Sequence, residues 1–153
     1  MRRVLKMMGI GVAAFLLLAQ LVPIDRSNPP VEGDVKAPPE IDRSLRAACY
    51  DCHSNETVWP WYSHVAPISW LLAYDVKEGR AELNFSTWPL YDAKKQQKKL
   101  KEIVETVNDG EMPSWYYVIV HPEARLADKD RQALVAWAGQ GTAGSAPVAP
   151  GSE

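Results

Sequence analysis

The sequence predicts a mainly helical domain with long irregular loops, preceded by an apolar N-terminal helix. Apolar residues recur at helical spacing in four segments after residue 39, and capping or stop residues bound most of these segments. Proline and aromatic residues crowd the stretches between them, which favours irregular loops. The 153 residues suffice for one domain of ordinary size, and a net charge of −2 gives no reason to expect a nucleic-acid partner.

The first 24 residues have the layout of an export signal. Three basic residues lie among the first six, and residues 7–22 are almost wholly apolar. No Ala-x-Ala pattern stands before Pro23, so we expect residues 1–24 to remain as a membrane anchor, with the rest of the chain on the periplasmic side of the bacterial inner membrane. The apolar run rises only about 24 Å, so bilayer thinning or flanking residues must help it to span. Cleavage and release into the periplasm is the alternative.

Residues 25–39 form a predicted linker, and the first helix of the domain follows it. Two Pro-Pro pairs favour extended backbone, in a span that either wraps the domain or holds it off the membrane. Within residues 40–54, four positions follow the helical spacing i, i+3, i+4, i+7: Leu45, Ala48, Cys49 and Cys52. This spacing predicts a helix with both cysteines on one apolar face.

Three more helices are predicted, over residues 68–78, 92–109 and 128–138. Each is followed by a glycine that is expected to end it, and the last two begin at an aspartate that can cap the helix. Residues 115–120 have the propensity of a strand but no evident partner for pairing. Residues 140–153, rich in Gly, Ala, Ser and Pro, are predicted to be a disordered tail, so the folded domain is expected to cover residues 40–139.

The strongest chemical signal is the stretch Cys49-Tyr50-Asp51-Cys52-His53. It has the form Cys-x-x-Cys-His, the attachment signature of a c-type haem. Two thiols about one helical turn apart can add to the two vinyl groups on one edge of a porphyrin, and the next imidazole can bind the iron. The chain has two cysteines, and both lie here. The motif predicts one covalent haem c, with Cys49 and Cys52 as thioether sites and His53 as the proximal iron ligand.

Three other interpretations of the two cysteines stay open. A thioredoxin-like redox pair calls for a βαβ setting, which the predicted elements do not provide. A zinc site needs four ligands, and only His64 and His121 remain as candidates to complete it. The two thiols could also close a small disulfide by themselves.

Six short motifs give the chain a more specific signature. They are Cys49-x-x-Cys52-His53-Ser54-Asn55, Trp59-Pro60-Trp61-Tyr62, Ala66-Pro67-x-Ser69-Trp70, Gly79-Arg80, Asn84-Phe85-Ser86-x-Trp88 and Gly110-x-Met112-Pro113. Together they resemble the bacterial haem-binding domain family, small exported monohaem proteins related to class I cytochromes c. The likeness runs from about Pro29 to Trp137 and implies a mostly helical, cytochrome c-like fold. A long Trp- and Pro-rich insertion between the haem motif and Met112 departs from the simplest cytochrome pattern.

Met112 is the predicted distal iron ligand. The resemblance places it where class I cytochromes carry a loop methionine on the second face of the iron. It also precedes Pro113 between two predicted helices, and the other methionines lie in the export segment. A methionine that only fills a gap in the core is the plain alternative. His64 is the alternative distal ligand, and His121 suits an ordinary surface turn.

Other side chains have weaker assignments. Six aromatic residues are expected to wall the haem or to pack the core around it: Trp59, Trp61, Trp70, Trp88, Trp115 and Tyr116. Arg80 is a candidate partner for a haem propionate, although arginine is more often solvated. The lysine-rich run at residues 94–99 is either a solvated helix face or a docking patch for an acidic redox partner.

Two main functions follow from this ligand set. With His53 and Met112 on the two iron faces, no site is left for a substrate, and the domain is expected to transfer electrons to a redox partner that the sequence does not identify. With a displaceable Met112, the domain would instead bind or sense a small ligand. A peroxidase-like enzyme is the third alternative, with His64 as the distal acid–base group.

Overall fold

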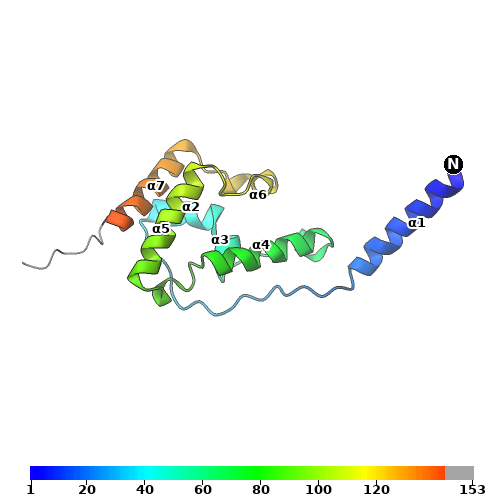
Figure 1. Ribbon diagram of the computed structural model, residues 1–153, viewed down its shortest axis with the longest axis horizontal. Coiled ribbons are helices and arrows are strands. Elements are labelled where there is room, and N and C mark those ends of the chain that lie inside the picture. The colour runs from blue at the N-terminus through cyan, green and yellow to red at the C-terminus, as the bar shows by residue number, and fades with distance from the viewer. Residues whose placement is uncertain (144–153) are drawn as a thin grey trace, which may run out of the picture.

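The computed structural model describes residues 1–143, and nearly all of its regular structure is helical (Figure 1). Over these residues the backbone forms no β-strand, and one isolated bridge joins Gly33 to Thr87. The prediction of a mainly helical fold is therefore confirmed. The elements in chain order are α1 (Arg2–Ala19), α2 (Pro39–Ala48), α3 (Tyr50–His53), η1 (Trp61–His64), α4 (Ile68–Glu82), η2 (Trp88–Leu90), α5 (Ala93–Asn108), α6 (Trp115–Val120), η3 (Pro122–Ala124) and α7 (Asp128–Ala143).

The core lies where α5 packs along α7 and where α2 crosses them. Helix α5 forms as the sequence predicts, because Asp92 caps it by accepting a hydrogen bond from the Lys95 amide at 2.7 Å. After its end, Gly110 takes a φ of +72°, a conformation that favours glycine. The buried apolar side chains of the three helices are Ile41, Leu45, Leu100, Ile103, Val107, Leu134 and Ala138.

Two predicted glycine stops lie inside helices. Helix α4 runs through Gly79 to Glu82, and α7 runs through Gly139 to Ala143. At Gly79 a Cβ atom would lie 2.5 Å from the carbonyl oxygen of Cys52, so glycine here permits a close approach of α4 to α3. Because α7 continues through Gly139 to Ala143, residues 140–143 are helical and do not belong to the predicted tail. The rest of the predicted tail, residues 144–153, lies outside the described residues.

Two further segments differ from their predicted secondary structure. The predicted helix 40–54 is broken at Cys49, where φ is −128°, into α2 and the single turn α3. The strand-like run Trp115–Val120 is the helix α6, whose first amides donate to the carbonyl of Ser114. An isolated run of high strand propensity has no neighbour with which to form a ladder, so local helical hydrogen bonds satisfy its backbone instead.

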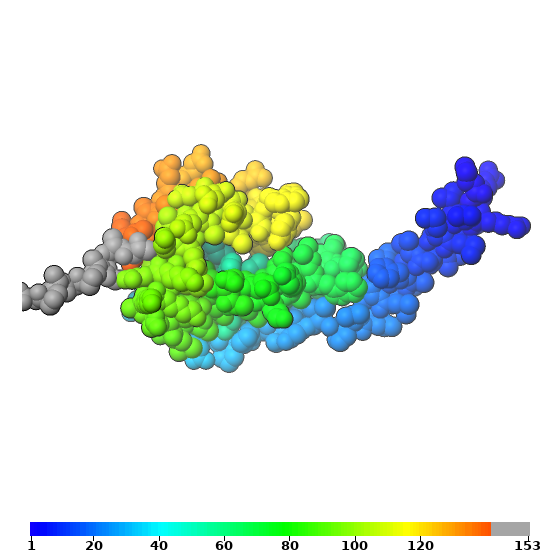
Figure 2. Space-filling view, in the orientation of Figure 1, coloured from blue at the N-terminus to red at the C-terminus, as the bar shows by residue number. Residues whose placement is uncertain are grey.

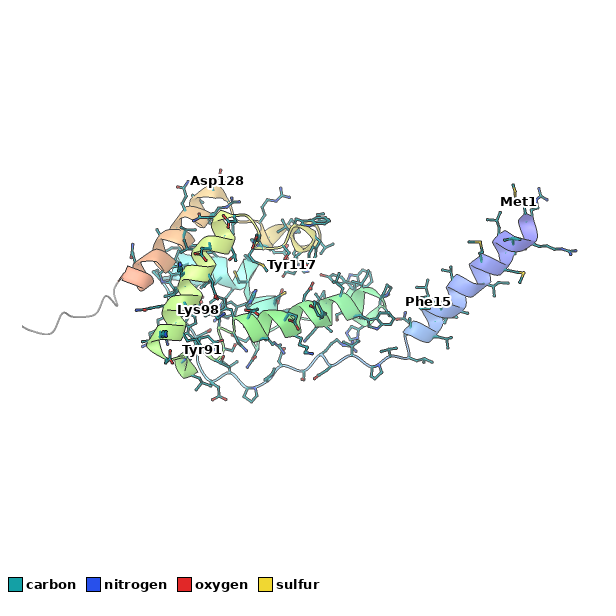
Figure 3. All side chains as sticks on the ribbon, in the orientation of Figure 1. Met1, Phe15, Tyr91, Lys98, Tyr117 and Asp128 are labelled. Atoms are coloured by element: carbon teal, nitrogen blue, oxygen red, sulfur yellow. The ribbon has the colours of Figure 1, made fainter. Side chains whose placement is uncertain are left out.

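The N-terminal helix α1 projects away from the domain (Figure 1), and side chains such as Phe15 extend outward from it (Figure 3). Every residue of α1 except Ala19 is exposed. No helix within residues 1–143 is long and apolar enough to cross a membrane. The predicted transmembrane anchor over residues 7–22 is thus not supported, since α1 ends at Ala19 and its first turns carry three basic residues.

The predicted linker wraps the domain as a strap, which we define as residues 20–38 (Figure 2). At its start, the Gln20 amide pairs with both backbone groups of Ala66, at 3.0 and 3.2 Å. At its middle, the carbonyl of Pro30 accepts a hydrogen bond from the side chain of Asn55 at 2.6 Å. The strap therefore belongs to the folded domain and lies across the segment that follows His53.

Candidate functional site

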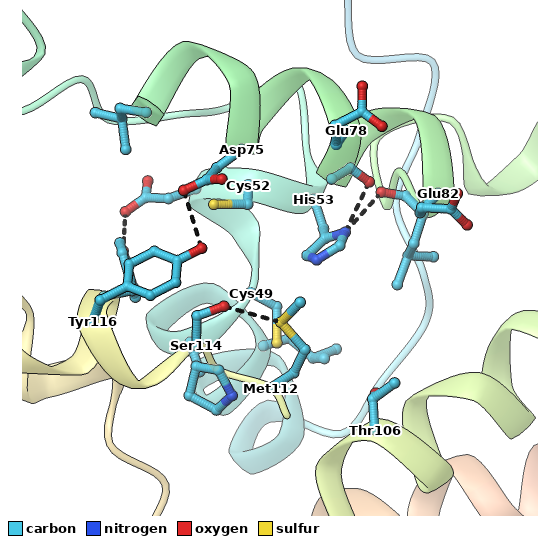
Figure 4. A pocket seen from close by; sticks show the side chains of 18 of the residues that line it. Cys49, Cys52, His53, Asp75, Glu78, Glu82, Thr106, Met112, Ser114 and Tyr116 are labelled. Carbon is cyan, nitrogen blue, oxygen red and sulfur yellow. Dashed lines mark hydrogen bonds between the residues drawn. The ribbon is translucent and has the colours of Figure 1, made fainter. Parts of the chain in front are cut away.

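A cavity of about 730 Å³ lies between α3, α4, α5 and the segment that leads into α6 (Figure 4). Its volume falls within the range of small-molecule and cofactor sites. Much of its lining is apolar, from four helices and the chain between them: Leu45, Ile68, Leu71, Leu72, Phe85, Ile103, Val107 and Val120. Cys49, Cys52, His53 and Met112 all line this one cavity, so the structure brings the predicted attachment and ligand residues together.

The two cysteines are separated by the turn that begins α3. The backbone amides of Cys52 and His53 both donate to the carbonyl of Cys49, at 3.2 and 2.8 Å. Both thiols are free, and burial raises the pKa of each to about 12. A thioredoxin-like pair calls for a βαβ setting, and residues 1–143 form no β-strand, so the structure does not provide that setting. The described residues also contain no cluster of three or more side chains able to hold a metal ion, and the zinc interpretation is not supported.

The imidazole of His53 is oriented by the backbone of α4. Its Nδ1 lies 2.9 Å from the carbonyl oxygen of Gly79 and 3.2 Å from that of Leu83. Carbonyl oxygens only accept, so Nδ1 carries the proton and Nε2 keeps its lone pair. Burial lowers the pKa of His53 and keeps the ring neutral. This arrangement is typical of a metal-binding histidine, whose second nitrogen is held by a backbone carbonyl.

Met112 reaches the same cavity from the chain between α5 and α6 (Figure 4). Its backbone amide donates to the carbonyl of Thr106 at 3.2 Å, which ties it to the end of α5. Its side chain is 40% exposed, and its sulfur accepts a long hydrogen bond of 3.8 Å from the hydroxyl of Ser114. Met112 is thus a boundary residue of the cavity and not a filler of the core.

The alternative histidines lie elsewhere. His64, at the end of η1, is exposed and does not line the cavity, so the structure does not bring this predicted distal ligand to the site. Both ring nitrogens of His121 are engaged, Nε2 by the hydroxyl of Tyr62 and Nδ1 by the carboxylate of Glu123 at 2.9 Å. Neither histidine is among the residues that line the cavity.

Arg80 differs from what the sequence suggests. The guanidinium of Arg80 lies outside the cavity lining and donates four hydrogen bonds: to the carbonyls of Ser54 and Ser27, the Asn28 side-chain oxygen and the Thr57 hydroxyl. It ties the strap to the segment after His53, and a propionate-binding role is not supported. In the lysine run, Lys98 and Lys99 both pair with Glu102 on α5, which reduces the basic character of that face.

Lys99 is a site residue that the sequence reasoning missed. It is only 7% exposed, it lines the cavity, and its ammonium lies 2.7 Å from a carboxylate oxygen of Glu102. Among the described lining residues it alone carries a permanent positive charge. The sequence does contain a signal for its burial. Lys99 stands beside Leu100 and one turn before Ile103, so it flanks the apolar stripe of α5.

The predicted aromatic wall is only partly present. Trp61 and Tyr116 line the cavity, whereas Trp88 packs in the core against Phe85 and Trp115 is 74% exposed. The indole N–H groups of Trp59 and Trp70 are buried without a hydrogen-bond partner, and neither ring lines the cavity.

Of the two tyrosines of α6 that reach the cavity, Tyr116 was expected from the sequence to wall the haem or pack the core, and Tyr117 was missed. Tyr116 and Tyr117 line the cavity and bond to acids on its other walls: the Tyr116 hydroxyl donates to Asp75 at 3.2 Å, and the Tyr117 hydroxyl donates to Asp51 at 2.6 Å. Burial raises the pKa of the Asp75 carboxyl, despite the hydrogen bond from Tyr116. No local pattern predicts these bonds, because their partners lie far apart in the sequence.

Comparison with known proteins identifies a family for the chain. A family model described as a haem-binding domain matches residues 14–140. The match extends from α1 through the strap, the cavity residues and most of α7. No curated protein and no solved structure matches the chain.

Proposed function

The chain belongs to the haem-binding domain family, and we propose that it holds one covalent haem c in the cavity and works as a one-electron carrier. The observation that carries this proposal is the orientation of His53. Its Nδ1–H is bound by the carbonyls of Gly79 and Leu83, so its Nε2 is available at the cavity that Met112 also lines. Electron transfer needs an iron ligated on both faces by the protein, and this pair can supply both ligands.

The residues of the cavity fit a haem in their chemistry. A largely apolar cavity suits the porphyrin, and two free thiols at its wall are the groups that a c-type attachment consumes. In each attachment the thiol S–H adds across a vinyl double bond, the sulfur joining one carbon and the hydrogen the other, so no oxidant is needed. When bound, the haem supplies an iron that takes up and releases one electron.

The chain's own residues have distinct roles in this proposal. Cys49 and Cys52 would hold the group through thioethers, and neutral His53 would donate the Nε2 lone pair to the iron. The thioether of Met112 would complete the ligand set and raise the reduction potential. Lys99, the buried cation of the lining, would face the carboxylates of the haem periphery. The basic and apolar N-terminal segment would direct export to the periplasm, where c-type attachment takes place.

A spectrum of the full chain tests the proposal. When the chain is produced in a host that attaches c-type haem, its mass should show one added haem, and its spectrum should show a low-spin iron with a sulfur–iron band. Met112→Ala should abolish that band without releasing the haem, while Met8→Ala, a matched change on the exposed helix α1, should leave it unchanged. Colourless protein, or a band that persists in Met112→Ala, would contradict the proposal.

A second function rests on the exposure of Met112. Its side chain is 40% exposed and its sulfur is held only by the long contact with Ser114, so a small ligand can compete for its place. In that case the domain would bind or sense a gas. Rapid binding of carbon monoxide by the reduced wild-type protein, together with a weak sulfur–iron band, would favour this second function over electron transfer.

A further inference from the structure

Helix α6 lies over the cavity without burying any of its own side chains. Trp115 and Ile119 are 74% and 67% exposed, and no residue of the helix is buried. A helix of six residues is not stable by itself, so contacts with other elements must hold it in place. These contacts decide how Met112, which lies three residues before the helix, is placed relative to the cavity.

Three phenol hydroxyls make these contacts, and we name them the phenol clasp. Tyr117 bonds to Asp51 on α3 at 2.6 Å, and Tyr116 bonds to Asp75 on α4 at 3.2 Å. The third bond joins Tyr62 on η1 to His121, which follows α6 directly. The clasp therefore connects one short helix to three separate elements of the domain.

Tyr117 occupies the central place in the clasp. Its ring stacks on His121 with a centroid distance of 4.3 Å, and its hydroxyl makes the shorter of the two bonds to a carboxylate. The acceptor is itself fixed, because the other carboxylate oxygen of Asp51 accepts from the Val58 amide at 2.9 Å. A short bond to an ionised acceptor is stronger than a neutral one. Asp51 lies between the two cysteines, so this bond links the attachment turn directly to α6.

We propose that Tyr117 is a positioning residue for Met112, acting through its hydrogen bond to Asp51. The segment that carries Met112 is held at two points: at one end the carbonyl of Thr106 binds the Met112 amide at 3.2 Å, and at the other end Tyr117 binds Asp51. Removing the second point takes away the shorter of the two bonds between α6 and a carboxylate, and so loosens the segment that carries the thioether. This inference rests on the proposed function, because it assigns the geometry of the same distal ligand.

The test compares Tyr117→Phe with Tyr74→Phe in the haem-loaded full chain. Tyr117→Phe keeps the ring that stacks on His121 and removes only the hydroxyl, whereas Tyr74 is a 61% exposed phenol on α4. We expect Tyr117→Phe to weaken the sulfur–iron band, to lower the reduction potential and to speed binding of carbon monoxide about tenfold. Amide exchange of residues 114–120 should also become faster. Tyr74→Phe should match the wild type in every measurement.

A second variant keeps the inference testable if Tyr117→Phe folds poorly. Asp51→Asn retains an acceptor but loses its charge, so it should weaken the same band by a smaller amount. The double variant should behave like Tyr117→Phe alone, because both changes act on one bond. A Tyr117→Phe spectrum and carbon monoxide rate equal to wild type, with Met112→Ala losing the band, would overturn the inference and leave the proposed function intact. A wild-type protein without a sulfur–iron band would overturn both.

Discussion

The two sides of the cavity are held together by different forces. On one side α2, α5 and α7 meet through buried apolar side chains, with Leu45, Leu134 and Ala138 fully buried. On the other side α6 and η1 are joined to the domain by the phenol clasp, and Trp115 and Trp61 stay largely exposed. Burial of a large apolar side chain contributes about 1.5–3 kcal/mol, against about 0.5–1.5 kcal/mol for an ordinary hydrogen bond.

The two proposed iron ligands lie on different sides of the cavity, so different kinds of contact hold them in place. His53 belongs to a turn packed against α4 and is oriented by two backbone carbonyls. Met112 lies on the side of the cavity that is held by hydrogen bonds, and it is 40% exposed. Changes in the apolar side should therefore affect folding, whereas changes in the clasp should affect the distal ligand more than the free energy of unfolding.

The largest effect is expected from Leu134→Ala in α7. Leu134 is 0% exposed, and its truncation should lower the free energy of unfolding by about 2–5 kcal/mol. Tyr117→Phe, on the clasp side, should lower it by only about 1 kcal/mol. Urea unfolding of both haem-loaded variants measures the difference, and Leu90→Ala, at a 68% exposed position, is the control. Equal losses for Leu134→Ala and Tyr117→Phe would contradict the comparison between the two sides.

A smaller effect is expected at the junction of α3 and α4. Gly79→Ala places a Cβ atom 2.5 Å from the carbonyl oxygen of Cys52, so the two helices must separate and the free energy of unfolding should fall by about 1–3 kcal/mol. The yield of attached haem should fall with it, because the Gly79 carbonyl orients His53. Gly139→Ala is the matched control: its Cβ atom meets nothing within 4 Å, and the change should stabilise α7 by about 0.5–1 kcal/mol. Equal losses of unfolding free energy in Gly79→Ala and Gly139→Ala would show that the close approach at Gly79 does not affect stability.

The smallest effect is expected at Glu102, on the solvent edge of α5. Burial raises the pKa of this carboxyl, but the hydrogen bond and charge of Lys99, with Lys98, outweigh that effect and hold it below the usual value. A lowered folded-state pKa contributes stability above the unfolded-state pKa and loses it as the pH falls through the folded value. Glu102→Gln should therefore destabilise the protein by less than about 1 kcal/mol at pH 7. This difference should shrink as the pH falls below the unfolded-state pKa of about 4.3, and it should vanish once the pH is below the folded-state pKa. A gap between the two proteins that persists in acid would exclude the ion pair as its cause.

Elements whose signals are local could be predicted from the sequence. The structure gives α5 as Ala93–Asn108 against the predicted residues 92–109, because the cap, the apolar stripe and the final glycine all lie within the segment itself. The motif of Cys49, Cys52 and His53 is local in the same way. The prediction that Met112 belongs to the same site agrees with its place in the cavity lining, and its ligation stays a prediction.

The predictions that differ from the structure concern residues whose role depends on contacts with distant parts of the chain. Gly79 and Gly139 have the local appearance of helix stops, yet Gly79 permits an approach to the backbone of Cys52, in another helix. Arg80 was a candidate partner for a haem propionate, but its partners include Ser27 and Asn28 in the strap. No periodicity or spacing within one segment reports such contacts, because they depend on which segments the fold brings together.

The strap sets an order of events for a chain that is synthesised from its N-terminus. Gln20 emerges before Ala66, its partner 46 positions later, and Arg26 before Ser63, 37 positions later. These hydrogen bonds form only after the intervening polypeptide has also emerged, because the later partner is absent until then. The turn that carries Cys49 and Cys52 is therefore made before the strap can close over the segment that follows His53.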